Sequence, residues 1–456
     1  MKFKSNYGKL IFKFVVFLAL CPFIGVHGSV LVDDETEVFL KEIVYKIKDV
    51  LNYQSEINVY VLDNQELNAA ATQNGDIVVN VGAILQCKNV KEMIAILAHE
   101  VAHVEGRHIV TFLSNQSNFI RGGLVTTLIG AIASVCAGSP APFIAGVAGG
   151  SAIGNQMALA ALRRRENMAD TNAAKAIKLL KWPVLEGFVS LHKNLLSNSG
   201  MYNMYLSTHP QSKDRVSKFE KYFAEEKKQK PDRAAIDLID KYDKLFSRVQ
   251  HKLRALLSQI EDARKIYANP KDTNELYAKA IVLHRAGQYQ KAIATINKLL
   301  ESSDDNEATA YYNEIKTMSL INTKKCVEAA DIASKTLSKC KKICNHRDLA
   351  IIYACAVVEG RVMPHCEKAI KILKKVSIFY KHDLSVWHML GELYTMVNKH
   401  WNASLCAAES AFLIEDLKGT IFHAEKARSA NDMVVKRRAA DLIATAKEAL
   451  TSNSDQ

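Results

Sequence analysis

Proline and glycine are scarce in this sequence, with 8 Pro and 20 Gly among 456 residues. So few helix-breaking residues argue against a collagen-like or loop-rich chain and favour helix. Hydrophobic residues make up 48% and charged residues 24% of the chain, which excludes wholesale disorder. The length predicts two or three domains rather than one.

A basic stripe with interleaved aromatic side chains is also missing. The formal net charge is +12, but four lysines lie within the first 13 residues. The sequence therefore does not predict nucleic acid as a partner.

The first 13 residues carry no acidic side chain, and the apolar run that follows is short. This run occupies residues 14–24, is interrupted by Pro22 and is followed by small residues up to Gly28. The order is typical of a secretory signal peptide, which we predict for residues 1–28. The alternative is an uncleaved membrane anchor, which the short run disfavours.

Cysteines gather in one part of the chain: six of the nine lie between residues 326 and 406. Export would place them in an oxidising compartment, where disulfides form. Their spacing does not define a pairing, and the other interpretation is that they are small buried residues of packed helices.

Three regions follow the predicted signal. Residues 29–225 mix short strand patterns with helices, residues 226–272 form a strongly charged helical linker, and residues 273–456 are helical throughout. We expect an α+β fold that is mainly α.

The last region contains repeats. Residues 387–394 match the W-x2-L-G-x2-Y start of a tetratricopeptide repeat, with Ala403 at the small position of the partner helix. Gly287 and Tyr289 fit the turn of an earlier repeat, and residues 310–337 follow with a weaker match. Because such helix pairs bury their apolar faces against their neighbours, we predict an α-solenoid. A generic helical domain is the alternative.

The strongest motif is His99-Glu100-Val101-Ala102-His103, inside an apolar-periodic run that predicts a helix over residues 91–110. Residues four apart share one helix face, so both imidazoles can reach one metal. This H-E-x-x-H arrangement predicts two zinc ligands, with Glu100 as general base for the attacking water.

A third ligand must come from elsewhere. The metzincin pattern requires histidine at position 109, which is Ile109, and His108 is one residue early, so we expect His108 to pack near the site. Downstream, Glu166 and Asp170 lie one helical turn apart. Glu166 can complete a His2Glu site, and Asp170 can hold a ligand imidazole through its second nitrogen. An exposed helix carboxylate is the alternative for Glu166.

These motifs, together with residues 209–215, resemble the HtpX and CAAX-protease family of zinc metallopeptidases, and residues 68–80 look like its strand pair ahead of the zinc helix. The resemblance implies a zincin-type domain with one zinc per chain. It implies zinc ligands at His99, His103 and Glu166. It also implies catalytic residues at Glu100, His209 and Arg215, with Asp170 supporting the ligands.

The role of His209 stays open at this point. Its imidazole could stabilise the developing oxyanion, or it could take the fourth metal position and hold the enzyme inactive. A simple turn residue before Pro210 is the third interpretation.

Two segments bear on how substrate is held. Asn74-Gly75 predicts a hairpin, and if residues 76–81 form an exposed edge strand, an extended chain could pair with it. An ordinary internal hairpin is the alternative. Residues 122–162 carry no charge and predict either a buried helical hairpin or a segment that contacts a membrane.

With the export signal and the repeats, the resemblance implies a periplasmic endopeptidase of a Gram-negative bacterium. Its substrates would be unfolded or misassembled envelope proteins, and its partner the machinery that assembles β-barrels in the outer membrane. The alternative function is a repeat-based chaperone or scaffold with latched or minor protease activity. The alternative location is the inner membrane, facing the periplasm.

Overall fold

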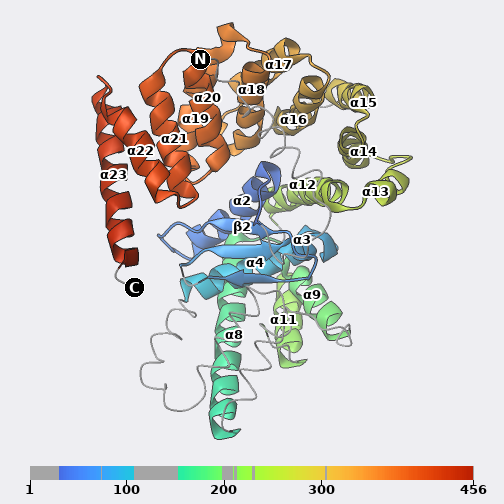
Figure 1. Ribbon diagram of the computed structural model, residues 1–456. Coiled ribbons are helices and arrows are strands. Elements are labelled where there is room, and N and C mark those ends of the chain that lie inside the picture. Colours follow the sequence, from blue (N-terminus) through green and yellow to red (C-terminus); the bar gives the residue numbers. More distant parts are fainter. Residues whose placement is uncertain are drawn as a thin grey trace. The chain divides into compact units, whose positions relative to one another are not determined.

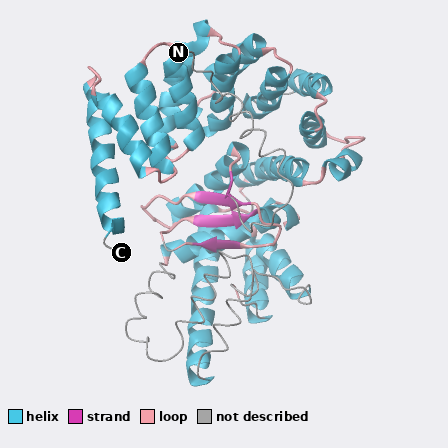
Figure 2. Ribbon diagram, in the orientation of Figure 1, coloured by secondary structure: helices cyan, strands magenta, loops and turns pink. Residues whose placement is uncertain are grey.

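The computed structural model describes residues 30–72, 74–106, 152–197, 209, 213–228, 232–302 and 306–454. The predicted signal peptide, His108 and residues 122–151 lie outside this part of the chain. The chain divides into two compact units, residues 1–254 and residues 255–456. The first unit mixes strands with helices, and in its described residues the second is helical (Figures 1 and 2). The predicted fold class, α+β and mainly α, is therefore confirmed.

The first unit contains a four-stranded sheet in the order β1-β2-β4-β3. Strands β2 and β4 run parallel, whereas β1 and β3 pair antiparallel with their neighbours. Alternate side chains of β2 and β4 are buried, as expected for a sheet that packs one face on helices. The strands are β1 Val30–Leu31, β2 Val59–Leu62, β3 Ala69–Ala71 and β4 Ile77–Asn80.

The predicted hairpin is confirmed, because β3 and β4 are joined through Gly75. This glycine has φ +85°, a left-handed conformation that favours glycine, and its N–H donates to the Thr72 carbonyl at 3.1 Å. The expectation that residues 76–81 form the edge strand is wrong. Strand β4 is internal, because β2 supplies a parallel partner on its other side, and β3 is the strand of this hairpin that lies at an edge of the sheet.

Helix α4, Val90–Glu105, lies at the centre of the first unit and confirms, over its described part, the helix predicted around the H-E-x-x-H motif. Asn89 caps its N-terminus by accepting the Glu92 N–H at 3.2 Å. Strand β3 and three helices pack against α4, so nearly all of its side chains are buried. The three helices are α2 Asp34–Val50, α8 Ala152–Leu180 and α9 Leu185–Ser197.

Three further helices lie in the described residues of this unit, the last of them ending just beyond it: α3 Val81–Gln86, α11 Lys213–Glu226 and α12 Arg233–Leu257. Helix α12 falls inside the predicted charged linker, yet it is bound to α2. The Nζ atom of Lys252 lies 2.6 Å from Asp33 Oδ1, and the Arg248 guanidinium pairs with Glu35. All four of these side chains are buried.

The second unit is a succession of helix pairs, each packed on the next, which confirms the predicted solenoid of repeats. Contacts recur at the 34-residue repeat length: the Tyr277 hydroxyl donates to the Tyr311 carbonyl at 3.4 Å, and Lys368 Nζ donates to Ser334 Oγ at 2.5 Å. The helices are α13 Ile260–Ile266, α14 Thr273–Arg285, α15 Tyr289–Ser302, α16 Asn306–Asn322, α17 Cys326–Lys339, η2 Ile343–His346, α18 Arg347–Glu359, η3 Met363–His365, α19 Cys366–Phe379, α20 Leu384–Met396, α21 His400–Leu413, α22 Leu417–Arg428 and α23 Met433–Ser454.

All seven cysteines in the described residues are free thiols. Burial raises the pKa of the Cys355 and Cys406 thiols to about 12, so they behave as small apolar residues of packed helices. Among the helices that the structure describes, we find none with the length and apolarity to cross a bilayer.

Candidate metal centre

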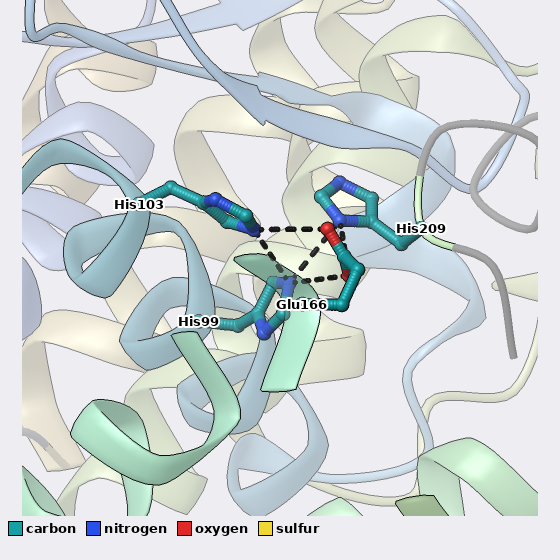
Figure 3. A group of neighbouring side chains, drawn as sticks. All are labelled: His99, His103, Glu166 and His209. Carbon is teal, nitrogen blue, oxygen red and sulfur yellow. Dashed lines mark hydrogen bonds and ion pairs between the residues drawn. The ribbon is translucent and has the colours of Figure 1, made fainter. Parts of the chain in front are cut away.

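Four buried side chains converge in the first unit: His99 and His103 from α4, Glu166 from α8, and His209 from the segment before α11 (Figure 3). Each offers one ligand atom, and these atoms all lie within 4.8 Å of one another. The two α4 imidazoles are one helical turn apart, which brings their ring centroids to 4.6 Å.

The distances between donor atoms fit a metal ion. His99 Nε2 lies 3.0 Å from His103 Nε2, 3.1 Å from His209 Nδ1 and 3.2 Å from Glu166 Oε2. Bonds of 2.0–2.1 Å to a tetrahedral zinc would separate neighbouring ligand atoms by about 3.3 Å. Three imidazoles and one carboxylate are also a donor set that zinc accepts. The residues present therefore fit the metal.

Asp170 fixes the orientation of His99. Its Oδ1 lies 3.1 Å from His99 Nδ1, on the side of the ring away from the cluster. A proton on Nδ1 that is donated to this carboxylate leaves the Nε2 lone pair directed at the other three residues.

Arg215 binds the two carboxylates of α8. Its Nε and Nη2 donate to Asp170 at 2.7 and 2.8 Å, and its Nη1 lies 3.2 Å from Glu166 Oε2. This forked contact holds both acids in place. The catalytic assignment of Arg215 stays a prediction, and in the structure its guanidinium contacts two buried carboxylates.

The charges of the cluster favour a cation. Burial by itself would raise the pKa of Glu166, but His209 and His99 outweigh it and hold this pKa well below its usual range. Burial would lower the pKa of His99, but Glu166 and Asp170 together raise it to about 10. Burial lowers the pKa of His103. The carboxylates thus stay ionised and draw positive charge toward themselves.

Glu100 lies beside the cluster. It is fully buried, and its Oε2 accepts the backbone N–H of Ala71 on β3 at 2.9 Å. Its Oε1 lies 3.5 Å from His209 Nε2. One carboxylate oxygen is therefore attached to the edge strand, while the other faces the histidine of the site.

The structure thus brings together all seven predicted site residues. Glu166 is 5% exposed, so its alternative interpretation as an exposed helix carboxylate is wrong. Sequence reasoning missed Ala71, because a backbone N–H leaves no side-chain signature in a motif.

The comparison with known proteins agrees with this geometry. Residues 35–222, which lie within the first unit, match the profile of peptidase family M48. The chain is also 22% identical, over 349 residues, to the β-barrel assembly-enhancing protease of Yersinia pestis, an alignment that covers 74% of this chain and 68% of the relative. The predicted resemblance is therefore confirmed. Among solved structures, the tetratricopeptide repeat domain of P58(IPK) matches at 12% identity, over 73% of this chain and 99% of its own, with a TM-score of 0.17.

Proposed function

We propose that the protein is a zinc endopeptidase in which His99, His103 and Glu166 bind one zinc ion per chain and Glu100 is the general base. The observation that carries this proposal is the cluster of buried donor atoms, in which neighbouring atoms lie 3.0–3.3 Å apart, with the Glu100 carboxylate beside it. The match to peptidase family M48 supports the same activity independently.

The residues around the site have separate tasks in peptide hydrolysis. Zinc, when bound, would polarise the scissile carbonyl and make the attacking water more acidic. Glu100 takes a proton from that water and passes it to the leaving amine. Asp170 holds the His99 imidazole, and Arg215 holds the Asp170 and Glu166 carboxylates, so both position the ligands.

The two ring nitrogens of His209 face different groups. Its Nδ1 lies 3.2 Å from Glu166 Oε2, and its Nε2 lies 3.5 Å from Glu100 Oε1. A side chain in this position would take up the fourth ligand position and lie against the general base. We therefore favour the latch over the oxyanion role, and His209 must move before a substrate carbonyl can enter.

The position of strand β3 at the edge of the sheet suits it to bind an extended substrate. The strand lies against the zinc helix, and one of its sides has no neighbouring strand in the described sheet. An extended chain can pair with such an edge through its backbone, which favours unfolded segments over folded ones.

The wider role follows from the relative and from the predicted export signal. We propose that the protein works in the periplasm on misfolded or stalled envelope proteins. The repeat unit would recruit these substrates or the machinery that assembles outer-membrane β-barrels. The relative's name as a β-barrel assembly-enhancing protease supports this placement.

A chaperone or scaffold with a latched protease is the second candidate. The position of His209 within the donor cluster favours it, because a closed metal site would hydrolyse little. The two candidates differ in whether Glu100→Gln can replace the natural protein in a deletion strain. Complementation by Glu100→Gln would support the scaffold and contradict the protease as the essential activity.

Zinc content and casein hydrolysis, measured side by side, test the proposal. We expect one zinc per chain and hydrolysis that is lost on chelation. Glu100→Gln should keep the zinc and lose hydrolysis, whereas His209→Ala should hydrolyse faster than the natural protein. Bound zinc without cleavage in either the natural protein or His209→Ala would favour the scaffold. A chain that binds no zinc would contradict the ligand assignment.

A further inference from the structure

The backbone groups of β3 point alternately toward β4 and away from it. The Asn80 N–H donates to the Asn68 carbonyl at 2.9 Å, and the Thr72 N–H donates to the Asp76 carbonyl at 2.7 Å. Hydrogen-bonded and non-hydrogen-bonded positions alternate along an antiparallel pair. Between these two bonds, Ala69 and Ala71 therefore direct their N–H groups away from β4, toward the edge of the sheet.

One of these two N–H groups already donates a hydrogen bond to a side chain of the protein. The Ala71 N–H donates to Glu100 Oε2 at 2.9 Å, and Glu100 is fully buried. A hydrogen bond to a buried carboxylate is stronger than one between neutral groups and restricts where the carboxylate can turn. The other oxygen, Oε1, is then directed toward His209 and the metal ligands.

The composition of β3 fits this contact. Alanine is depleted in strands, yet β3 consists of three alanines. The Ala69 and Ala71 side chains are buried, and β3 packs on α4. Small side chains let the strand approach the helix closely enough for the Glu100 side chain to reach a backbone N–H.

We propose that the Ala71 N–H is the positioning group for the general base, so that the strand that accepts substrate also orients Glu100. This inference rests on the proposed peptidase function. Because the Ala71 N–H is committed to Glu100, the N–H of Ala69 is the edge donor left for a substrate strand. Ala69 is 2% exposed, so the site must open before a substrate strand can reach this N–H. Alternate residues of one short strand would thus serve substrate binding and proton transfer.

Two matched proline substitutions test the proposal. An edge strand tolerates proline where the N–H faces away from its neighbour, which holds for Ala71→Pro and for Ala69→Pro. Each change deletes one such N–H, but only Ala71→Pro frees Glu100. We expect Ala71→Pro to lower kcat by about 10- to 100-fold, since a misplaced catalytic group costs a loss of this order. Zinc content should not change, and Ala71→Gly, which keeps the N–H, should retain activity.

Ala69→Pro should keep kcat within about twofold and raise KM, because it removes an edge donor without touching the base. An Ala71→Pro protein that folds, binds zinc and keeps its kcat would overturn the positioning role. So would an equal loss of kcat in both proline variants.

Amide hydrogen exchange provides a readout without substrate. In Glu100→Ala, the Ala71 N–H should exchange at least ~10-fold faster than in the natural protein, because its acceptor has gone. The Thr72 N–H, which is bonded to Asp76, should exchange at its original rate. Unchanged exchange at Ala71 would refute the inference even if Ala71→Pro did not fold. If the protein hydrolyses no substrate but Glu100→Ala still speeds exchange of the Ala71 N–H, the peptidase function is contradicted. The hydrogen bond between Ala71 and Glu100 would still be established.

Discussion

Replacing Arg215 with leucine should weaken both the fold and the metal site. Arg215 is 3% exposed and contacts two buried carboxylates, with two bonds to Asp170 and one contact to Glu166. Removing one partner of a buried ion pair typically costs about 3–5 kcal/mol, because the remaining charge stays buried without compensation. In a domain of this size, that loss corresponds to a decrease in Tm of roughly 6–20 °C.

The zinc affinity should fall as well, by about 10- to 100-fold, as is typical when a group that orients metal ligands is lost. Thermal unfolding in the presence of a chelator and in buffers with fixed free zinc would measure both effects. Arg215→Lys is the matched variant: it keeps the charge but lacks the planar fork, so we expect intermediate losses. The reasoning is refuted if Arg215→Leu binds zinc as tightly as the natural protein and unfolds at the same temperature.

Three further substitutions test stability away from the metal site. Burial alone would raise the pKa of Asp33, but Lys252 outweighs it and lowers this pKa. The pair's contribution to stability is therefore present above the ordinary pKa of aspartate and lost as the pH falls through the folded value. Lys252→Met should cost about 3–5 kcal/mol at pH 7, and less in acid, where Asp33 can take a proton. Urea unfolding of the natural protein and of Lys252→Met across this pH range measures the loss in the free energy of unfolding. A loss that does not depend on pH would contradict the pairing of Lys252 with Asp33. Gly187→Ala should cost about 1–3 kcal/mol, because the new Cβ would lie 2.3 Å from the Lys91 backbone. In Gly391→Ala the nearest atom is 3.4 Å away, so this helix substitution should be neutral or stabilising in the same melts.

The parts of the fold that follow from local chemistry could be predicted from the sequence. The spacing of His99 and His103, and that of Glu166 and Asp170, depends only on helix geometry, and the structure places each pair on one helix. The hairpin through Gly75 and the 34-residue repeats are equally local.

Features that depend on distant partners could not be predicted in this way. Strand β4 is internal because Val59–Leu62 pairs with it in parallel. No pattern within residues 76–81 predicts this second neighbouring strand. The charges of α12 indicated a charged helical linker but did not identify its partners: Arg248 and Lys252 are buried against acids more than 200 residues earlier. The Ala71 contact to Glu100 joins a backbone atom to a side chain, so it has no sequence pattern at all.

The balance of buried charge explains why this site is suited to a divalent cation. Three carboxylates lie within or next to the cluster, those of Glu100, Glu166 and Asp170, and Arg215 supplies one fixed positive charge among them. Buried charges are costly unless they are compensated. A dication bound by neutral imidazoles would balance the two charges that remain, whereas a single proton on His99 would balance only one. The same acids that make the site costly to fold without metal would therefore favour a doubly charged ion over a proton. The donor atoms lie 3.0–3.2 Å apart, close to the separation of about 3.3 Å between the ligands of a tetrahedral zinc ion.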